Sequence, residues 1–245
     1  MLGHSANYRL EVLGRFRLKH DARQLVSIRP SCRRLVGLLA VNGAHHRVEA
    51  AEALWPGLAE QQAQSNLRTV LWRLRQQQSD LVAEDDGYVS LTDVAVDLND
   101  VVDWCHASLG ESSPESLPPK AVARDVLPGW PDSWLMLPRE ELQVLKVHAL
   151  EAAGAKALMA GRFGDACNLV RVAINLDPLR ESASRLLIEI YLREGNPVHA
   201  VRHFRLFAAR LRDEIGADPN PATTALVASY LPDELSSRRS EARRY

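Results

Sequence analysis

One stretch of the chain, residues 61 to 78, combines cationic and hydrogen-bonding side chains at helical spacing. Its sequence, QQAQSNLRTVLWRLRQQQ, contains neither Gly nor Pro, and it has three Arg but no acidic residue. The apolar residues follow a helical period, so they share one face: Ala63, Leu67, Val70, Leu71 and Leu74. The pattern predicts an amphipathic helix whose opposite face is polar and basic.

The polar face of this predicted helix has the chemistry that binds DNA. Arg neutralises phosphates or bonds the guanine edge, whereas amides and hydroxyls suit adenine edges and phosphate oxygens. The candidate DNA-contacting residues are Gln62, Ser65, Asn66, Arg68, Thr69, Arg73 and Gln76 on the helix, with Arg47 and Tyr88 outside it. The alternative is a solvated face whose arginines only keep the protein in solution.

Trp72 fits a solvated face poorly, because it lies on the polar side of the helix. An indole there is either poorly hydrated or covered by something. We predict that it packs against the hairpin that follows or against the second domain, in preference to DNA.

Residue patterns for catalysis or for a metal are weak. His45 and His46 are expected in a loop, and His199 and His203 are spaced i, i+4 on a helix, but no third ligand is evident. The chain has no G-x-S-x-G, no P-loop and no G-x-G-x-x-G motif. Its three cysteines lie too far apart in sequence for a metal pair or a disulfide framework. We therefore expect a protein that is not an enzyme and that holds no metal or cofactor.

The elements around the basic helix predict a winged helix. Period-two alternation over 8–13, 16–19 and 25–28 indicates a small antiparallel sheet, and helices are expected over 30–42 and 48–54 before 61–78. Short strands at 81–82 and 88–91 flank an Asp86-Gly87 turn. Three helices and a hairpin in this order define a winged helix, whose third helix enters the major groove. We assign this domain to residues 1–103.

The second half predicts helical repeats. A linker is expected over 104–120, which is rich in Ser and Pro, followed by an all-α domain over 121–233 and a disordered tail over 234–245. Leu158 and Leu192, Gly161 and Gly195, and Ala166 and Ala200 recur at an offset of 34, the tetratricopeptide (TPR) period. Helix pairs are therefore expected at 140–160 with 164–176 and at 181–194 with 197–213, and a capping helix at 221–230. The predicted fold class is mainly α: an amino-terminal winged helix and a TPR-like domain.

Net charge is unevenly distributed along the chain. The total is −1, but residues 1–79 carry +7, residues 80–119 carry −10 and residues 120–245 carry +2. A basic module beside an acidic stretch indicates a charged partner. No apolar run is long enough to span a membrane, and the amino end has no targeting pattern, so we expect a cytoplasmic protein without a membrane partner.

Several ordered segments resemble one family of regulators. The amino-terminal module resembles the OmpR-like winged helix of SARP-type (antibiotic regulatory protein) transcriptional activators, and the second module resembles their bacterial transcriptional activator domain (BTAD). The matching segments, spread over about 8–231, are LEVLGRF (10–16), RRLVGLLA (33–40), EALWP (52–56), NLR (66–68), LR (74–75), GY (87–88), LPGWxxxW (127–134), LDP (176–178) and LRDEIG (211–216).

The resemblance implies an activator that binds promoter direct repeats through its third helix and recruits RNA polymerase holoenzyme, as a homodimer or larger assembly. We predict this function, with control of a biosynthetic gene cluster such as one for an antibiotic. One departure is the acidic wing tip, Ala83 to Tyr88, which repels phosphate. It leaves open an alternative function: a protein-interaction adaptor whose winged helix no longer binds DNA.

Overall fold

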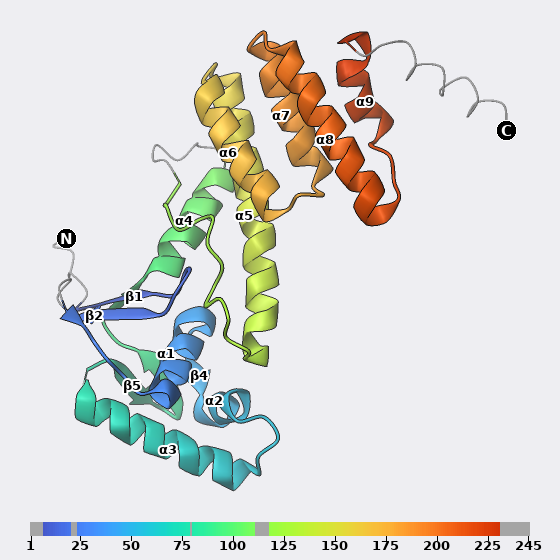
Figure 1. Ribbon diagram of the computed structural model, residues 1–245. Helices are drawn as coiled ribbons and strands as arrows, with labels where there is room; N and C mark the ends of the chain where they lie inside the picture. The colour runs from blue at the N-terminus through green and yellow to red at the C-terminus, as the bar shows by residue number, and fades with distance from the viewer. Residues whose placement is uncertain (1–6, 21–23, 79, 111–117, 231–245) are drawn as a thin grey trace. The chain divides into compact units, whose positions relative to one another are not determined.

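The computed structural model describes residues 7–20, 24–78, 80–110 and 118–230 (Figure 1). The chain divides into two compact units. The first comprises Met1–Trp104 and Ser116–Val144, and the second comprises Cys105–Glu115 and Leu145–Tyr245. The chain passes from one unit to the other within helices α4 (Asp97–Leu109) and α5 (Met136–Met159).

The first unit begins with a sheet whose strand order is β3-β2-β1-β7. Strands β1 (Tyr8–Glu11), β2 (Arg17–His20) and β3 (Gln24–Leu25) are antiparallel, as the alternation predicts. The fourth strand, β7 (Val94–Val96), pairs parallel to β1 and was not predicted. Three residues are too few to display a period-two pattern.

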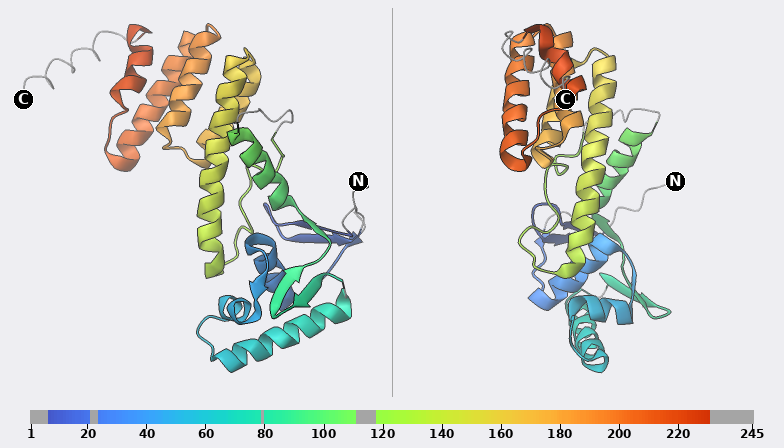
Figure 2. Two further views of the ribbon diagram at one scale, coloured as in Figure 1. Left: turned by 180° about the vertical axis from the view of Figure 1, so that it is seen from behind. Right: turned by 90° about the vertical axis from the view of Figure 1, so that its right-hand side faces the viewer.

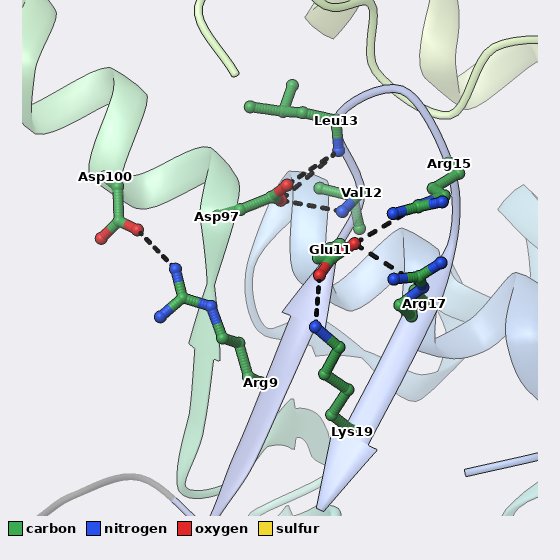
Figure 3. A network of polar contacts seen from close by, with 9 residues as sticks. All are labelled: Arg9, Glu11, Val12, Leu13, Arg15, Arg17, Lys19, Asp97 and Asp100. Carbon is green, nitrogen blue, oxygen red and sulfur yellow. Dashed lines mark hydrogen bonds and ion pairs between the residues drawn. The ribbon is translucent and has the colours of Figure 1, made fainter. Parts of the chain in front are cut away.

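A buried carboxylate joins this sheet to the start of α4 (Figure 3). Asp97 Oδ1 accepts a 2.8 Å hydrogen bond from the Val12 backbone N–H, and Asp97 also accepts from the N–H of Leu13. Burial raises the pKa of Asp97 above its ordinary value of 3.8, although these two bonds act in the opposite direction. Asp97 therefore satisfies two backbone donors where β1 ends.

The carboxylate of Glu11 forms ion pairs with basic residues of β2 and of the turn before it (Figure 3). Glu11 bonds Lys19 Nζ at 2.8 Å and lies 3.4 Å from Arg15 Nε and 3.8 Å from Arg17 Nε. Partial burial disfavours its charge, but Lys19 and the two arginines keep the pKa of Glu11 below its ordinary value of 4.5. Three of the cations in the basic module thus share one internal carboxylate, which offsets a single positive charge.

The rest of the first unit is a winged helix, as predicted. Helices α1 (Pro30–Asn42), α2 (Arg47–Leu54) and α3 (Glu60–Gln77) are followed by the hairpin of β5 (Val82–Asp85) and β6 (Tyr88–Leu91), which we call the wing. Asp86 and Gly87 both have positive φ (45° and 77°), as a two-residue turn of this hand requires. His45 and His46, expected in a loop, instead form strand β4 and pair with β6, because the wing offers a free edge.

The predicted boundary between the halves differs from the observed division. Residues 104–109, assigned to a linker, lie in α4, where Trp104, Cys105 and Ser108 are buried. The Ser and Pro content after residue 110 obscured the helical pattern before it. Residues 111–117 of the expected linker and the expected tail, 234–245, lie outside the described residues.

Residues 121–144, expected in the second domain, belong to the first unit, as do residues 118–120 of the expected linker. Leu127 N–H donates to the Val12 carbonyl at 2.8 Å, and the Trp130 ring stacks on Phe16 with centroids 5.7 Å apart. Gly37 of α1 leaves room for this indole, since a Cβ there would lie 2.9 Å from Trp130 Cζ3. The segment therefore covers α1 of the winged helix.

The second unit is a stack of antiparallel helices: α5, α6 (Phe163–Leu176), α7 (Glu181–Arg193), α8 (Pro197–Ile215) and α9 (Pro221–Val227). From α6 to α9 each helix contacts the next (Figures 1 and 2). These bounds match the predicted helices closely. The TPR-like prediction for this half is confirmed.

The 34-residue offset reflects a repeated helix end. Gly161 and Gly195 have φ of 72° and 83°, and their N–H groups donate to Leu158 and Leu192. No atom lies within 4 Å of the position of a Cβ at either glycine, so these glycines serve to end helices and not to let two helices pack closely. Helices α5 and α6 do pack closely at Gly154, where a Cβ would lie 2.6 Å from Val170 Cγ2.

Candidate nucleic-acid interface

Helix α3 lies along the outside of the first unit (Figures 1 and 2). Its five apolar residues are at most 3% exposed and pack among α1, α2 and β5. Burying this stripe directs the opposite side outward, because a helix turns about 100° per residue. The apolar spacing read from the sequence therefore decides which side chains remain available for a partner.

The outward side carries most of the predicted contact residues. Those exposed are Gln62, Ser65, Arg68, Thr69 and Gln76, whereas Asn66 and Arg73 are half-buried. The Thr69 hydroxyl donates to the Ser65 carbonyl at 3.0 Å, which orients it along the helix. At about 100° per residue, Arg68 and Arg73 lie toward opposite edges of the exposed face.

The charges of Arg68 and Arg73 are not neutralised internally. Within the described residues neither forms an ion pair, in contrast to Arg34, whose Nε lies 2.8 Å from Asp132 Oδ1, and to Arg75. Arg73 lies near the start of α1. Burial raises the pKa of the Cys32 thiol above 9.0 there, and the nearby charge of Arg73 opposes the rise. Both guanidiniums therefore remain available to phosphates or bases.

The wing is less acidic than its sequence suggests. Glu84 lies between two cations, with Oε1 3.2 Å from Arg75 and Oε2 3.7 Å from Arg47. Arg47, predicted to contact DNA, thus lies beside the turn of the wing, where its backbone N–H also donates to the Gly87 carbonyl at 2.9 Å. Arg75 was missed as a member of the site, because only the fold reveals its position across from the wing.

Tyr88 lies at the tip end of strand β6 and is 51% exposed. Its ring meets the His46 ring edge-on, with centroids 5.5 Å apart. This contact holds the phenol beside the wing turn. Tyr88 therefore joins Arg47 in a group that is separate in sequence from α3 but belongs to the same winged helix.

Trp72 is 62% exposed, so the prediction that it packs within the chain is wrong. The indole lies between Arg68 and Ser65 in angle around α3, on the side away from the core. An exposed indole at the centre of a polar face is unusual for a surface that meets only water. It adds an apolar contact to the candidate interface.

The described residues contain no cluster of three or more His, Cys, Asp or Glu side chains that could act as metal ligands. His199 contacts Tyr191, with ring centroids 5.5 Å apart. None of the helices described is long and apolar enough to cross a membrane.

Comparisons with known proteins agree with this architecture. Residues 123–231 match the bacterial transcriptional activator domain family. The chain is 28% identical over 245 residues to the regulatory protein AfsR of Streptomyces coelicolor, an alignment that covers 93% of this chain and 24% of AfsR. The chain thus spans about a quarter of the length of that relative.

A solved structure has a similar fold. It is Mycobacterium tuberculosis EmbR in complex with a low-affinity phosphopeptide, with a TM-score of 0.64 and 18% identity over 96% of this chain and 69% of the EmbR chain. The two chains share a fold in which a winged helix is joined to a TPR-like domain. The carboxy-terminal half contains a BTAD, and the chain as a whole is similar to the SARP-type regulators.

Proposed function

We propose that this protein is a sequence-specific DNA-binding transcriptional activator that reads the major groove with α3. The observation that carries the proposal is that Arg68 and Arg73 have no ion-pair partner among the described residues, on a helix face that also presents Trp72 and neutral hydrogen-bonding groups. Arginines supply phosphate affinity and guanine contacts, and Gln62, Ser65 and Gln76 supply further base-edge or phosphate contacts.

The wing would contribute a second contact beside the helix. Glu84 is neutralised by Arg47 and Arg75, which removes one of the negative charges that favoured an adaptor without DNA binding. Tyr88 presents a hydroxyl and a ring at the wing turn. Phosphate contact by Tyr88 and Arg47 would orient α3 in the groove without reading sequence.

The wider activity follows from the family. We propose that the protein binds promoter direct repeats as a homodimer or larger assembly, recruits RNA polymerase holoenzyme and controls a biosynthetic gene cluster. Support comes from the BTAD match and the likeness to AfsR, which is itself a regulatory protein.

A salt titration tests DNA binding directly. A duplex selected from a random-sequence library is titrated with the full chain between low and moderate salt. Log affinity should fall linearly with log salt concentration, and Arg68→Ala or Arg73→Ala should reduce the slope by about 1 and the affinity about tenfold.

The matched control is Arg185→Ala, which removes an exposed arginine from α7 in the second unit. It should leave the slope and the affinity unchanged. Failure to select or bind any duplex at low salt would overturn the proposal in favour of the adaptor. Equal losses in all three variants would reduce the effect to net charge and exclude α3 as the reading element.

A further inference from the structure

The second unit contains a pocket of about 400 Å³ lined by three consecutive helices. Side chains from α6, α7 and α8 contribute to it, which places it on the TPR-like stack itself. The volume is within the range of small-molecule sites, about 300 to 1,000 Å³. The lining residues are Arg171, Ile174, Asn175, Leu187, Tyr191, His199, Arg202, His203 and Leu206.

The lining is positive and contains no acidic residue. Arg171 comes from α6 and Arg202 from α8, and neither has an ion-pair partner in the part of the chain that the structure describes. Other arginines of this unit are neutralised: Arg180 by Glu151 at 3.0 Å and Arg212 by Asp218 at 2.9 Å. Two guanidiniums without an ion-pair partner among the described residues therefore line one pocket.

His203 reports the electrostatics of this site. Burial, together with the charges of Arg210 and Arg171, lowers the pKa of His203 from 6.5 to about 4. Its Nε2 is buried and has no hydrogen-bond partner among the described residues. A buried polar atom without a partner is uncommon in a complete site.

The remaining lining residues add an apolar wall. Ile174, Leu187 and Leu206 come from the same three helices as the charged groups. Tyr191 and His199, whose rings are in contact, also line the pocket. A ligand that fits this lining has an anionic group for the guanidiniums and an apolar body for the aliphatic side chains.

The geometry points to a binding site, in the pocket lined by α6, α7 and α8, for a small anion that carries a carboxylate or phosphate on an apolar body. Arg171 and Arg202 bind the anionic group, as paired guanidiniums do. Asn175 and His199 supply further donors, and Leu187 and Leu206 contact the body. The site is independent of DNA binding by α3.

Isothermal titration calorimetry of the full chain tests the site with four probes: phenyl phosphate, benzoate, inorganic phosphate and benzamide. At least one of the first two should bind with one-to-one stoichiometry, and comparing them shows whether phosphate or carboxylate is preferred. Inorganic phosphate should bind about tenfold more weakly because it lacks the apolar body, and benzamide should not bind because it lacks the charge.

Variants then locate the binding. Arg171→Gln and Arg202→Gln should each weaken binding of the preferred probe at least about tenfold, whereas Arg185→Gln on α7 should leave it within about twofold. Circular dichroism and thermal unfolding confirm that the variants fold. The proposal is overturned if neither aromatic anion binds at about 10 mM, or if all three variants lose affinity equally.

Discussion

The outer face of α3 and the α6–α8 pocket both present unpaired arginines beside neutral hydrogen-bonding groups, but they differ in curvature. On α3 the groups follow one convex helix, where Arg68, Arg73 and Trp72 project from a single element. In the pocket they converge from three helices onto a volume of about 400 Å³. The same residue types therefore suit a long grooved polymer in one place and a compact ligand in the other.

Charge reversal at Arg68 should separate the two regions most sharply. Arg68→Glu should lower the affinity for the selected duplex about 100-fold, since a carboxylate replaces a phosphate contact. Binding of phenyl phosphate or benzoate should not change. Fluorescence anisotropy measures the first quantity and calorimetry the second. A parallel loss of both would show that the two regions are not independent.

Titration of His203 should reveal the burial and the positive charge around its imidazole, whereas α3 carries no histidine. Because its pKa in the folded state is about 4 against 6.5 ordinarily, the unfolded chain takes up the proton first as pH falls. The stability that this group contributes is fully present above about pH 6.5 and is lost as the pH falls to about 4, by about 3 kcal/mol.

Chemical denaturation between pH 7 and 4 measures this loss, and His203→Gln isolates it from the titration of carboxylates. The groups nearest the imidazole are Arg171 and Arg210, with His199 and Arg202 also lining the pocket. The variant should lose less stability than the wild type over this range. Identical slopes for the two proteins would contradict a depressed pKa.

Removing the exposed indole should weaken DNA binding without affecting the fold. Trp72→Ala should lower duplex affinity about tenfold, because apolar surface buried against DNA contributes about 25 cal/mol per Å². The melting temperature should change little, since the side chain is 62% exposed. Unchanged affinity would show that Trp72 faces something other than DNA.

Releasing the wing cations should have the smallest effect. Glu84→Gln frees Arg47 and Arg75 from their ion pairs, so duplex affinity should rise about two- to threefold, with a steeper salt dependence. Glu52→Gln, which alters an exposed carboxylate of α2, is the control for net charge. A fall in affinity would show that Glu84 positions the wing.

Elements with a long, strongly periodic pattern could be predicted from the sequence. Helix α3 and helices α6 to α8 are amphipathic over three or more turns, and the 34-residue offset marks a repeated helix end at Gly161 and Gly195. Strand β7 and strand β4 were not predicted, because two or three residues carry no readable period and form strands only where a neighbouring edge accepts them.

The exposure of the candidate site residues could be predicted only in part, for a similar reason. Helical spacing indicated which residues of α3 face away from the core, and the fold places Gln62, Ser65, Arg68, Thr69 and Gln76 there. It did not reveal that Trp72 lies uncovered or that Arg75 reaches Glu84, since both depend on what stands opposite the helix.

The sequence by itself determined the two kinds of domain and the polar, basic character of α3, because hydrophobic periodicity and residue type are local properties. Only the tertiary structure decided which charges remain uncompensated. Glu84 pairs with Arg47 and Arg75, Glu11 binds Lys19, and Arg68, Arg73, Arg171 and Arg202 have no ion-pair partner in the ranges that the structure describes. Electrostatic interactions depend on distances in space. Counting charged residues along the sequence therefore cannot distinguish a cation in an internal ion pair from one that is available to a ligand.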